Sequence, residues 1–171
     1  MIVGVTGHRP DKLGTNSVSG YVKDNPLRVW IKTQMRDHLK QLRPIYAISG
    51  MAIGVDQDFA EVCIELRIPF VAAVPFEGQE RTWPIESQED YRALLAKAHE
   101  VVVVSDGPYE RWKLHARNEW VVDHINVLIA VFDGTLGGTA NTVNYADRVQ
   151  REKRRINPNE FHALRAAAGA P

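Results

Sequence analysis

Short polar or glycine-rich segments follow directly on five apolar runs of the sequence, and they hold the residues that could do chemistry. Glycines let backbone amides approach an anion, arginine and histidine donate hydrogen bonds to phosphate, and carboxylates accept them from ribose hydroxyls. In chain order the segments contain Gly7, His8 and Arg9; Ser49, Gly50 and Gly54; Pro75, Phe76 and Glu77; Ser105, Asp106 and Gly107; and Asp133, Gly134, Gly137, Gly138 and Thr139. These residue types favour a site for a phosphorylated small molecule.

The glycine pair Gly137–Gly138 and the following Thr139 stand where an apolar run gives way to a helical pattern. A helix N-terminus presents free backbone N–H groups and the positive end of the helix dipole, so it favours a phosphate. The segment lacks the GK[ST] sequence of a Walker loop. Two interpretations stay open: a phosphate cradle, or a tight turn, which uses the same residues.

The loop after the first apolar run presents His8 and Arg9 between Gly7 and Pro10. Arg9 could hold a phosphate in its fork of donors, and His8 could donate to the same group or stack on a base. The alternative is that Arg9 pairs with Asp11 while His8 caps backbone. We favour the binding role because the loop follows a strand expected at the centre of the sheet.

Two further positions each allow two interpretations. Asp56 begins a helical pattern, where a carboxylate suits ribose hydroxyls and suits equally the capping of the helix. Trp83 could offer a stacking face for a base, or it could belong to the core.

The sequence gives no signal for a metal site, a bound cofactor or a catalytic nucleophile. Its 6 histidines form no HxxxH or Cys/His array, and it has no GxSxG elbow. The single cysteine, Cys63, lies in a helical pattern, as a small buried apolar residue would. One cysteine cannot form a disulfide within the chain, which is typical of a reducing, cytoplasmic compartment.

Short apolar runs alternate with amphipathic segments along the chain, and this alternation predicts a βαβ series. Strands are expected at MIVGVTG, IYAISG, PFVAAVPF, VVVVS and VLIAVFDG, and helices from the cap Asn25–Pro26 to about Leu42, in GVDQDFAEVCIELRI, from about Ser87 to His99, around WKLHARNEWVVDH and in GGTANTVNYADRVQ. Right-handed crossovers make such a sheet parallel, with helices on both faces and every strand-to-helix loop at one edge. The predicted fold class is α/β, a Rossmann-like domain with a parallel sheet of about five strands.

Three local interpretations complete this prediction. The run VVVV, which is wholly β-branched, is expected to be a strand covered on both faces. The basic run REKRR at 151–155 is expected to be the solvated end of a helix. The sequence contains no repeat or linker, so residues 1–171 are expected to form a single domain with a peripheral tail from about residue 156.

Length and charge restrict the classes of function. A chain of 171 residues with 44% hydrophobic and 25% charged residues is typical of one soluble globular domain. Its formal net charge of zero argues against a nucleic-acid backbone as the main partner. No apolar run reaches membrane-spanning length and no basic leader precedes the first one, so neither a transmembrane helix nor a signal peptide is expected.

Three collinear segments, VTGHRPDKLG, SGMAIGVDQDFAE and PFEGQERTWP, resemble the YpsA/YspA-like branch of the SLOG superfamily, and the resemblance extends from Met1 to about Tyr145. It implies a Rossmann-like protein of bacteria or their phages that binds nucleotides or nucleotide-derived ligands. The candidate ligand-binding residues are Gly7, His8, Arg9, Ser49, Gly50, Gly54, Asp56, Glu77, Trp83, Ser105, Arg117, Asp133, Gly137, Gly138 and Thr139.

Two other groups of this superfamily are also similar in sequence. SGMAIGVD resembles a segment of DprA, which handles single-stranded DNA, and the region from His115 to Val143 resembles the LOG phosphoribohydrolases. In the latter resemblance Arg117 matches an arginine and Gly138–Thr139 match a GT pair. Asn118 replaces a lysine, and the motif's glutamate falls at Thr142, which has no carboxylate. The candidate catalytic residues are therefore open: Arg117, with Glu119, Asp133, Glu77 or Asp56 as a relocated carboxylate.

Three functions remain in competition. The favoured one is a protein that binds a nucleotide or an ADP-ribose-like ligand, as a sensor, carrier or sequestering protein. The second is an N-glycosidic hydrolase of nucleotides with a relocated carboxylate, and the third is a DprA-like accessory in nucleic-acid processing. The resemblance also implies a homo-oligomer, for which the tryptophans Trp112 and Trp120 are candidate interface residues.

Overall fold

The structure, a computed structural model, describes residues 1–13 and 24–169. Gly14 of the first polar segment and the last two residues of the tail lie outside the described residues. The elements in chain order are β1 (Ile2–Gly7), the 3-10 helix η1 (Pro10–Lys12), α1 (Pro26–Leu42), β2 (Tyr46–Ser49), α2 (Val55–Glu65), β3 (Phe70–Val74), α3 (Ile85–Leu95), β4 (Glu100–Val103), α4 (Arg111–Asp123), β5 (Val127–Val131), α5 (Gly138–Arg148), β6 (Glu152–Ile156) and α6 (Pro158–Ala167).

The strands form one six-stranded sheet in the order β4-β3-β2-β1-β5-β6, and every neighbouring pair is parallel. The chain runs outward from β1 to β4 and then returns to the other side of β1 to form β5 and β6. The strand order therefore reverses between β1 and β5. In open α/β sheets ligands bind outside the carboxyl ends of the strands at such a switch point. The predicted fold class is confirmed.

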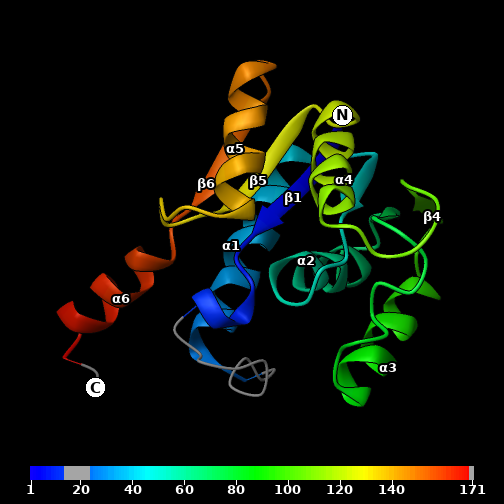
Figure 1. Ribbon diagram of the computed structural model, residues 1–171. Helices are drawn as coiled ribbons and strands as arrows, with labels where there is room; N and C mark the ends of the chain where they lie inside the picture. The colour runs from blue at the N-terminus through cyan, green and yellow to red at the C-terminus, as the bar shows by residue number, and fades with distance from the viewer. Residues whose placement is uncertain (14–23, 170–171) are drawn as a thin grey trace.

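Helices cover both faces of this sheet (Figure 1). On one face α1, α2 and α3 pack against a buried cluster that includes Val5 of β1 and Phe70 of β3. On the other face α4 and α5 pack through Val121 and Ala146 against Leu128 of β5. The C-terminal α6 lies beside α1, where the rings of Phe161 and Trp30 are 5.9 Å apart.

The start of α1 follows from its sequence, as predicted. The side-chain oxygen of Asn25 accepts hydrogen bonds from the backbone N–H groups of Leu27 and Arg28 at 3.0 and 3.2 Å. Pro26 occupies the first helical position, where the missing N–H costs nothing. The cap fixes the register that turns the apolar face of α1 toward the sheet.

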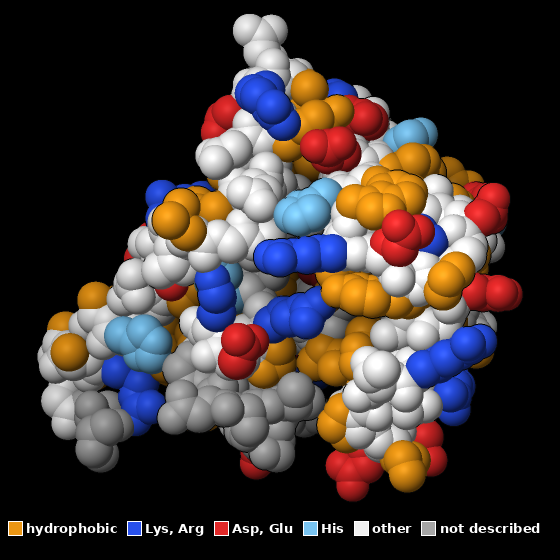
Figure 2. Space-filling view, in the orientation of Figure 1, with side chains coloured by type: hydrophobic (Ala, Val, Ile, Leu, Met, Phe, Trp, Pro, Cys, Tyr) orange, Lys and Arg blue, Asp and Glu red, His pale blue; other side chains and the backbone are white. Residues whose placement is uncertain are grey.

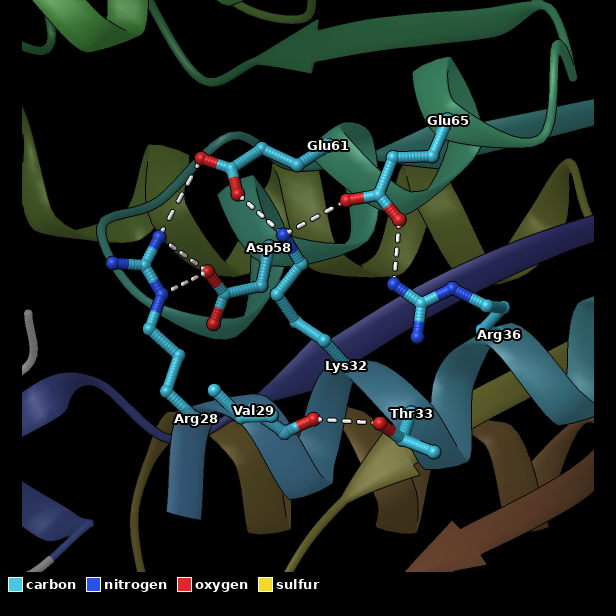
Figure 3. A network of polar contacts seen from close by, with 8 residues as sticks. All are labelled: Arg28, Val29, Lys32, Thr33, Arg36, Asp58, Glu61 and Glu65. Carbon is cyan, nitrogen blue, oxygen red and sulfur yellow. Dashed lines mark hydrogen bonds and ion pairs between the residues drawn. The ribbon is translucent and has the colours of Figure 1, made fainter. Parts of the chain in front are cut away.

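A ladder of ion pairs joins α1 to α2 (Figure 3). Arg28, Lys32 and Arg36 stand one turn apart on α1 and reach the acidic side chains of α2. Their contacts are Arg28 to Asp58 at 2.7 Å and to Glu61 at 3.5 Å, Lys32 to Glu61 at 2.8 Å and to Glu65 at 3.1 Å, and Arg36 to Glu65 at 2.5 Å. The ladder is graded in burial, because the Asp58 side chain is 0% exposed and the Glu65 side chain is 42% exposed.

This gradient in burial predicts that loss of a carboxylate lowers the free energy of unfolding more at Asp58 than at Glu65. Asp58→Asn is expected to lower the free energy of unfolding by about 2 to 4 kcal/mol, since it removes the charge of the fully buried carboxylate, the nearer of the two paired with Arg28. Glu65→Gln, at the exposed end, is expected to cost less than about 1 kcal/mol. Urea denaturation measures both, and equal effects of the two variants would contradict the assignment of the strength to the buried end.

Two predictions about the ends of the sheet are wrong. The run REKRR is not the end of a helix, because Glu152–Ile156 form β6 and pair with β5 along its whole length. A free parallel edge outweighs the weak strand propensity of charged residues, and Ile156, 2% exposed, anchors the strand in the core. Nor is VVVV covered on both faces, because β4 is an edge strand whose Val101 and Val103 are 45% and 43% exposed.

None of the helices in residues 1–13 and 24–169 combines the length and the apolar character needed to cross a membrane.

Candidate functional site

A cavity of about 320 Å³ lies at the carboxyl end of β1, at the point where the strand order reverses. It is hollowed between the loop after β1, the loop before α2, the start of α5 and one side of α4. Figure 2 shows Lys and Arg side chains gathered around a hollow on this face. The lining residues are Thr6, Gly7, His8, Arg9, Asp11, Lys12, Ala52, Asp56, Arg111, Leu114, His115, Arg117, Asn118, Gly138 and Thr139.

The N-terminus of α5 forms one wall of this cavity through Gly138 and Thr139. No side chain caps the helix, and its first turn holds no acidic residue. The N-terminus of α2 is also uncapped by a side chain, but its first turn contains Asp56 and Asp58. Because carboxylates already offset the dipole of α2, the start of α5 is the better place for an external anion.

Three cations that line the cavity, Arg9, Lys12 and Arg111, form no ion pair with a described carboxylate. In particular, among the described residues Arg9 does not pair with Asp11. Lys12 donates to the carbonyl oxygen of Leu136 at 2.6 Å, which places its ammonium beside the start of α5. Arg111 is the first residue of α4, where the helix dipole disfavours a positive charge. An anion bound between these cations would be stabilised by all three.

A buried ion pair of Asp56 and Arg117 lies between the α2 and α4 sides of the cavity. Arg117 Nη1 donates to Asp56 Oδ2 at 3.2 Å, and the Ala52 N–H donates to the same oxygen at 3.4 Å. Burial raises the pKa of Asp56 and lowers that of Arg117, and each charge opposes the shift of the other. The Nε atom of Arg117 is buried and has no hydrogen-bond partner.

Beneath this pair, Ser49 and Gly50 hold its position. Ser49 Oγ donates to the backbone oxygen of Asp56 at 2.6 Å and accepts from the Met51 N–H at 3.2 Å, which fixes the turn from β2 into α2. A Cβ on Gly50 would lie 1.4 Å from Arg117 Nη1. Glycine is therefore required at position 50 because the guanidinium passes directly over its backbone.

The loops after β1 and β5 are joined by His8 and Asp133. His8 Nε2 lies 2.8 Å from Asp133 Oδ1, which also accepts the backbone N–H and the hydroxyl of Thr135, both at 2.8 Å. Burial would raise the pKa of Asp133, but the hydrogen bonds from Thr135 and His8 lower it to about 2. Since the carboxylate is ionised, His8 Nε2 carries the proton and donates, which fixes the imidazole at the cavity.

The structure brings many of the predicted site residues together. Gly7, His8, Arg9, Asp56, Arg117, Gly138 and Thr139 line the cavity. Ser49, Gly50 and Asp133 contact lining residues from behind, while Gly54 and Gly137 immediately precede the helices α2 and α5.

Other predicted residues lie away from the lining. Glu77 is exposed in the loop after β3, and Ser105 is half-buried after β4. Trp83 packs edge-on against Tyr91, with ring centres 5.3 Å apart, and contacts the main core cluster. Glu119 is exposed on α4 and does not line the cavity. Thr142 donates its hydroxyl to the carbonyl oxygen of Gly138 at 2.9 Å, so its side chain is used within α5.

Sequence reasoning found Arg117 on α4 but missed the other α4 residues that line the cavity. Arg111, Leu114, His115 and Asn118 line it from α4, and their spacing of three, four and seven residues is that of one helix face. This periodicity could have been found in the sequence. Lys12 was also missed, because its place beside Leu136 depends on two loops that lie 124 residues apart.

The residues at 1–13 and 24–169 contain no group of three or more His, Cys, Asp or Glu side chains placed to hold a metal ion.

A family model and a relative each match more than half of the chain. The YpsA model, described as the YspA SLOG family, matches residues 3–164. The chain is similar to the uncharacterized SPbeta prophage-derived protein YoqJ of Bacillus subtilis, with 30% identity over 118 residues, which are 59% of this chain and 68% of YoqJ.

Two solved structures share the fold. DNA processing protein A from Helicobacter pylori, which binds single-stranded DNA, has a TM-score of 0.64 and 16% identity and covers 100% of this chain and 74% of its own. The molybdenum cofactor binding protein from Rippkaea orientalis has a TM-score of 0.57 and 17% identity, with 95% and 82% of the two chains covered. At such identities these likenesses concern the fold alone.

Proposed function

We propose that this chain, which belongs to the YspA SLOG family, binds a nucleotide or a nucleotide-derived, ADP-ribose-like ligand in the cavity at the switch point. It would act as a sensor, carrier or sequestering protein. The observation that carries the proposal is the meeting of three unpaired cations, Arg9, Lys12 and Arg111, with the uncapped N-terminus of α5. This combination selects an anion carrying more than one negative charge.

The polarity of the cavity suggests how such a ligand lies. Its phosphate would accept hydrogen bonds from the first N–H groups of α5, with Arg9 and Lys12 beside it. Its ribose would lie toward Asp56, where Oδ2 accepts the hydrogen bonds from Ala52 and Arg117. A volume of about 320 Å³ falls at the lower end of the range for small-molecule sites.

The first experiment is a binding panel. The purified protein is mixed with nucleoside mono-, di- and triphosphates, ADP-ribose and cyclic ADP-ribose isomers, and the bound and free fractions are analysed by mass spectrometry. Recovery of one of these ligands intact supports the proposal. A protein that retains none of them contradicts it.

Arg9→Ala is expected to weaken binding of the ligand found in this panel by about tenfold to a hundredfold, because a charged hydrogen bond to phosphate contributes about 1.5 to 3 kcal/mol. Isothermal titration calorimetry measures the change. Arg148→Ala removes another exposed arginine, at the other end of α5, and serves as the matched control. Equal affinities of the two variants would remove Arg9 from the site.

A second function is favoured by one observation, the presence of Asp56 in the cavity wall beside Arg117. A carboxylate near the ribose could stabilise positive charge on the sugar and steer a water molecule, as N-glycosidic hydrolysis requires. The same mass-spectrometric panel tests it: free base together with ribose phosphate would support a hydrolase, and their absence after long incubation would oppose one.

Neither nucleic-acid binding nor self-association enters this proposal. The net charge of zero gives no support to a DNA-processing role, although a solved structure with the same fold binds single-stranded DNA. A homo-oligomer stays a prediction. Of its two candidate tryptophans, Trp112 is 54% exposed, whereas Trp120 is stacked on His124 with ring centres 3.9 Å apart.

A further inference from the structure

The two edges of the sheet are protected very differently. At one edge β6 carries Glu152, Lys153, Arg154 and Arg155, and charged side chains of this kind discourage pairing with another strand. At the other edge β4 carries one charge, Glu100, followed by an unbroken run of valines from Val101. β4 holds no proline or lysine, and its Val101 and Val103 are exposed. β4 therefore lacks the protection that β6 has.

The hydrogen-bonding direction of β4 follows from its pairing with β3. The Val104 N–H donates to the Val74 carbonyl at 2.9 Å. Alternate residues of a parallel strand direct their backbone groups to the same neighbour, so Val102 also faces β3. The N–H and C=O groups of Val101 and Val103 consequently point outward, away from the sheet.

The outward N–H and C=O groups of Val101 and Val103 can pair with the same groups of β4 in a second copy of the chain. In an antiparallel pairing of two β4 strands about a two-fold axis at Val102, Val101 of each copy faces Val103 of the other. Both residues point outward, so each such pair exchanges two N–H···O=C bonds. Glu100 then faces Val104 of the other copy, and no like charges oppose each other. The register satisfies the exposed edge and pairs valine with valine on both faces of the sheet.

The helix at this end of the molecule supports the same arrangement. α3 lies at the β4 end of the sheet (Figure 1). Its exposed charged residues are acidic at Glu86, Glu89 and Asp90 and basic at Arg92, and the exposed Lys97 follows the end of the helix. A two-fold axis normal to the sheet sets two copies of α3 antiparallel, so the acidic start of one helix lies toward the end of the other, where Arg92 and Lys97 stand.

We propose that two copies of this chain associate edge to edge through β4, in antiparallel register centred on Val102, to form one continuous sheet. The cavity opens at β1, which two further strands separate from β4, so the interface leaves it accessible. The interface is narrow, and association is therefore expected to depend on protein concentration.

Sedimentation velocity of the full chain over a wide range of concentrations tests the proposal. The wild type is expected to pass from monomer to dimer, and Val103→Lys is expected to weaken self-association by at least about tenfold, since it places a charge at the edge and opposite Val101. Val29→Lys is the matched control, because Val29 is a similarly exposed valine, at 49%, on α1. Thermal unfolding shows that each variant is folded.

Hydrogen exchange provides a second readout that does not depend on a variant. The amides of Val101 and Val103 are expected to exchange more slowly as the concentration rises, whereas the outward amides of β6 are not. A wild type that stays monomeric, a dimer that Val103→Lys leaves unchanged, or β4 covered by a strand of a different protein would each overturn the proposal. None of these outcomes depends on nucleotide binding, so the two proposals fail separately.

Discussion

Gly138→Asp is expected to abolish binding of a phosphorylated ligand, with a loss of at least about a hundredfold in affinity, while the protein stays fully folded. A Cβ at position 138 meets no atom within 4 Å, so the new side chain fits without strain. Its carboxylate would stand in the first turn of α5, where it repels a phosphate and interacts favourably with the helix dipole. Calorimetry with the ligand found in the panel measures the loss.

The stability of Gly138→Asp shows whether a loss of binding comes from the site or from unfolding. An acidic residue in the first turn of a helix stabilises it by about 0.3 to 1 kcal/mol, so the melting temperature of Gly138→Asp should equal or exceed that of the wild type. Gly138→Asn has nearly the same shape without the charge and is the matched control. If the Asp and Asn variants bind equally well, the phosphate does not lie at the start of α5.

The order of the elements could be predicted because each depends on local pattern. Alternation of apolar runs and amphipathic segments predicted five strands and five helices close to the positions found, although the helix expected from about Ser87 to His99 spans Ile85–Leu95. Asn25–Pro26 marked the start of α1. The resemblance to the YspA SLOG family is likewise confirmed by the match over residues 3–164. The strand β6 could not be predicted in this way, because it depends on strand order. It forms because β5 presents a free edge, which no local pattern in REKRR shows.

In the candidate site, too, the residues that depend on local pattern could be predicted, and those that depend on contacts between distant elements could not. Residues that immediately follow strands, such as His8 and Arg9, could be predicted, because a parallel sheet gathers all such loops at one edge. Loops after β3 and β4 lie at the same edge but farther from the switch point, so Glu77 and Ser105 do not line the cavity. The contacts of Arg117 with Asp56 and Gly50 join α4 to α2, and the sequence contains no signal for their approach.

Gly50→Ala is expected to lower the free energy of unfolding by about 3 to 5 kcal/mol, the usual cost of breaking a buried ion pair. The added Cβ would lie 1.4 Å from Arg117 Nη1 and 2.8 Å from Asp56 Oδ2, so the guanidinium must leave and the buried carboxylate loses its partner. Affinity for the ligand should fall as well, because Arg117 and Asp56 both line the cavity. Urea denaturation and calorimetry measure the two losses.

A double-mutant cycle separates this cause from a general intolerance of the turn. Gly138→Ala adds the same methyl group where nothing is near and should leave stability almost unchanged. In an Arg117→Ala background the guanidinium is gone and, of the atoms nearest to a Cβ at position 50, Asp56 Oδ2 at 2.8 Å remains, so Gly50→Ala should then cost less than half of what it costs in the wild type. If the two costs are equal, position 50 requires glycine for a reason other than the passage of Arg117. If they differ as expected, the glycine after β2 and the arginine of α4 act as one unit that sets the position of Asp56 in the cavity wall.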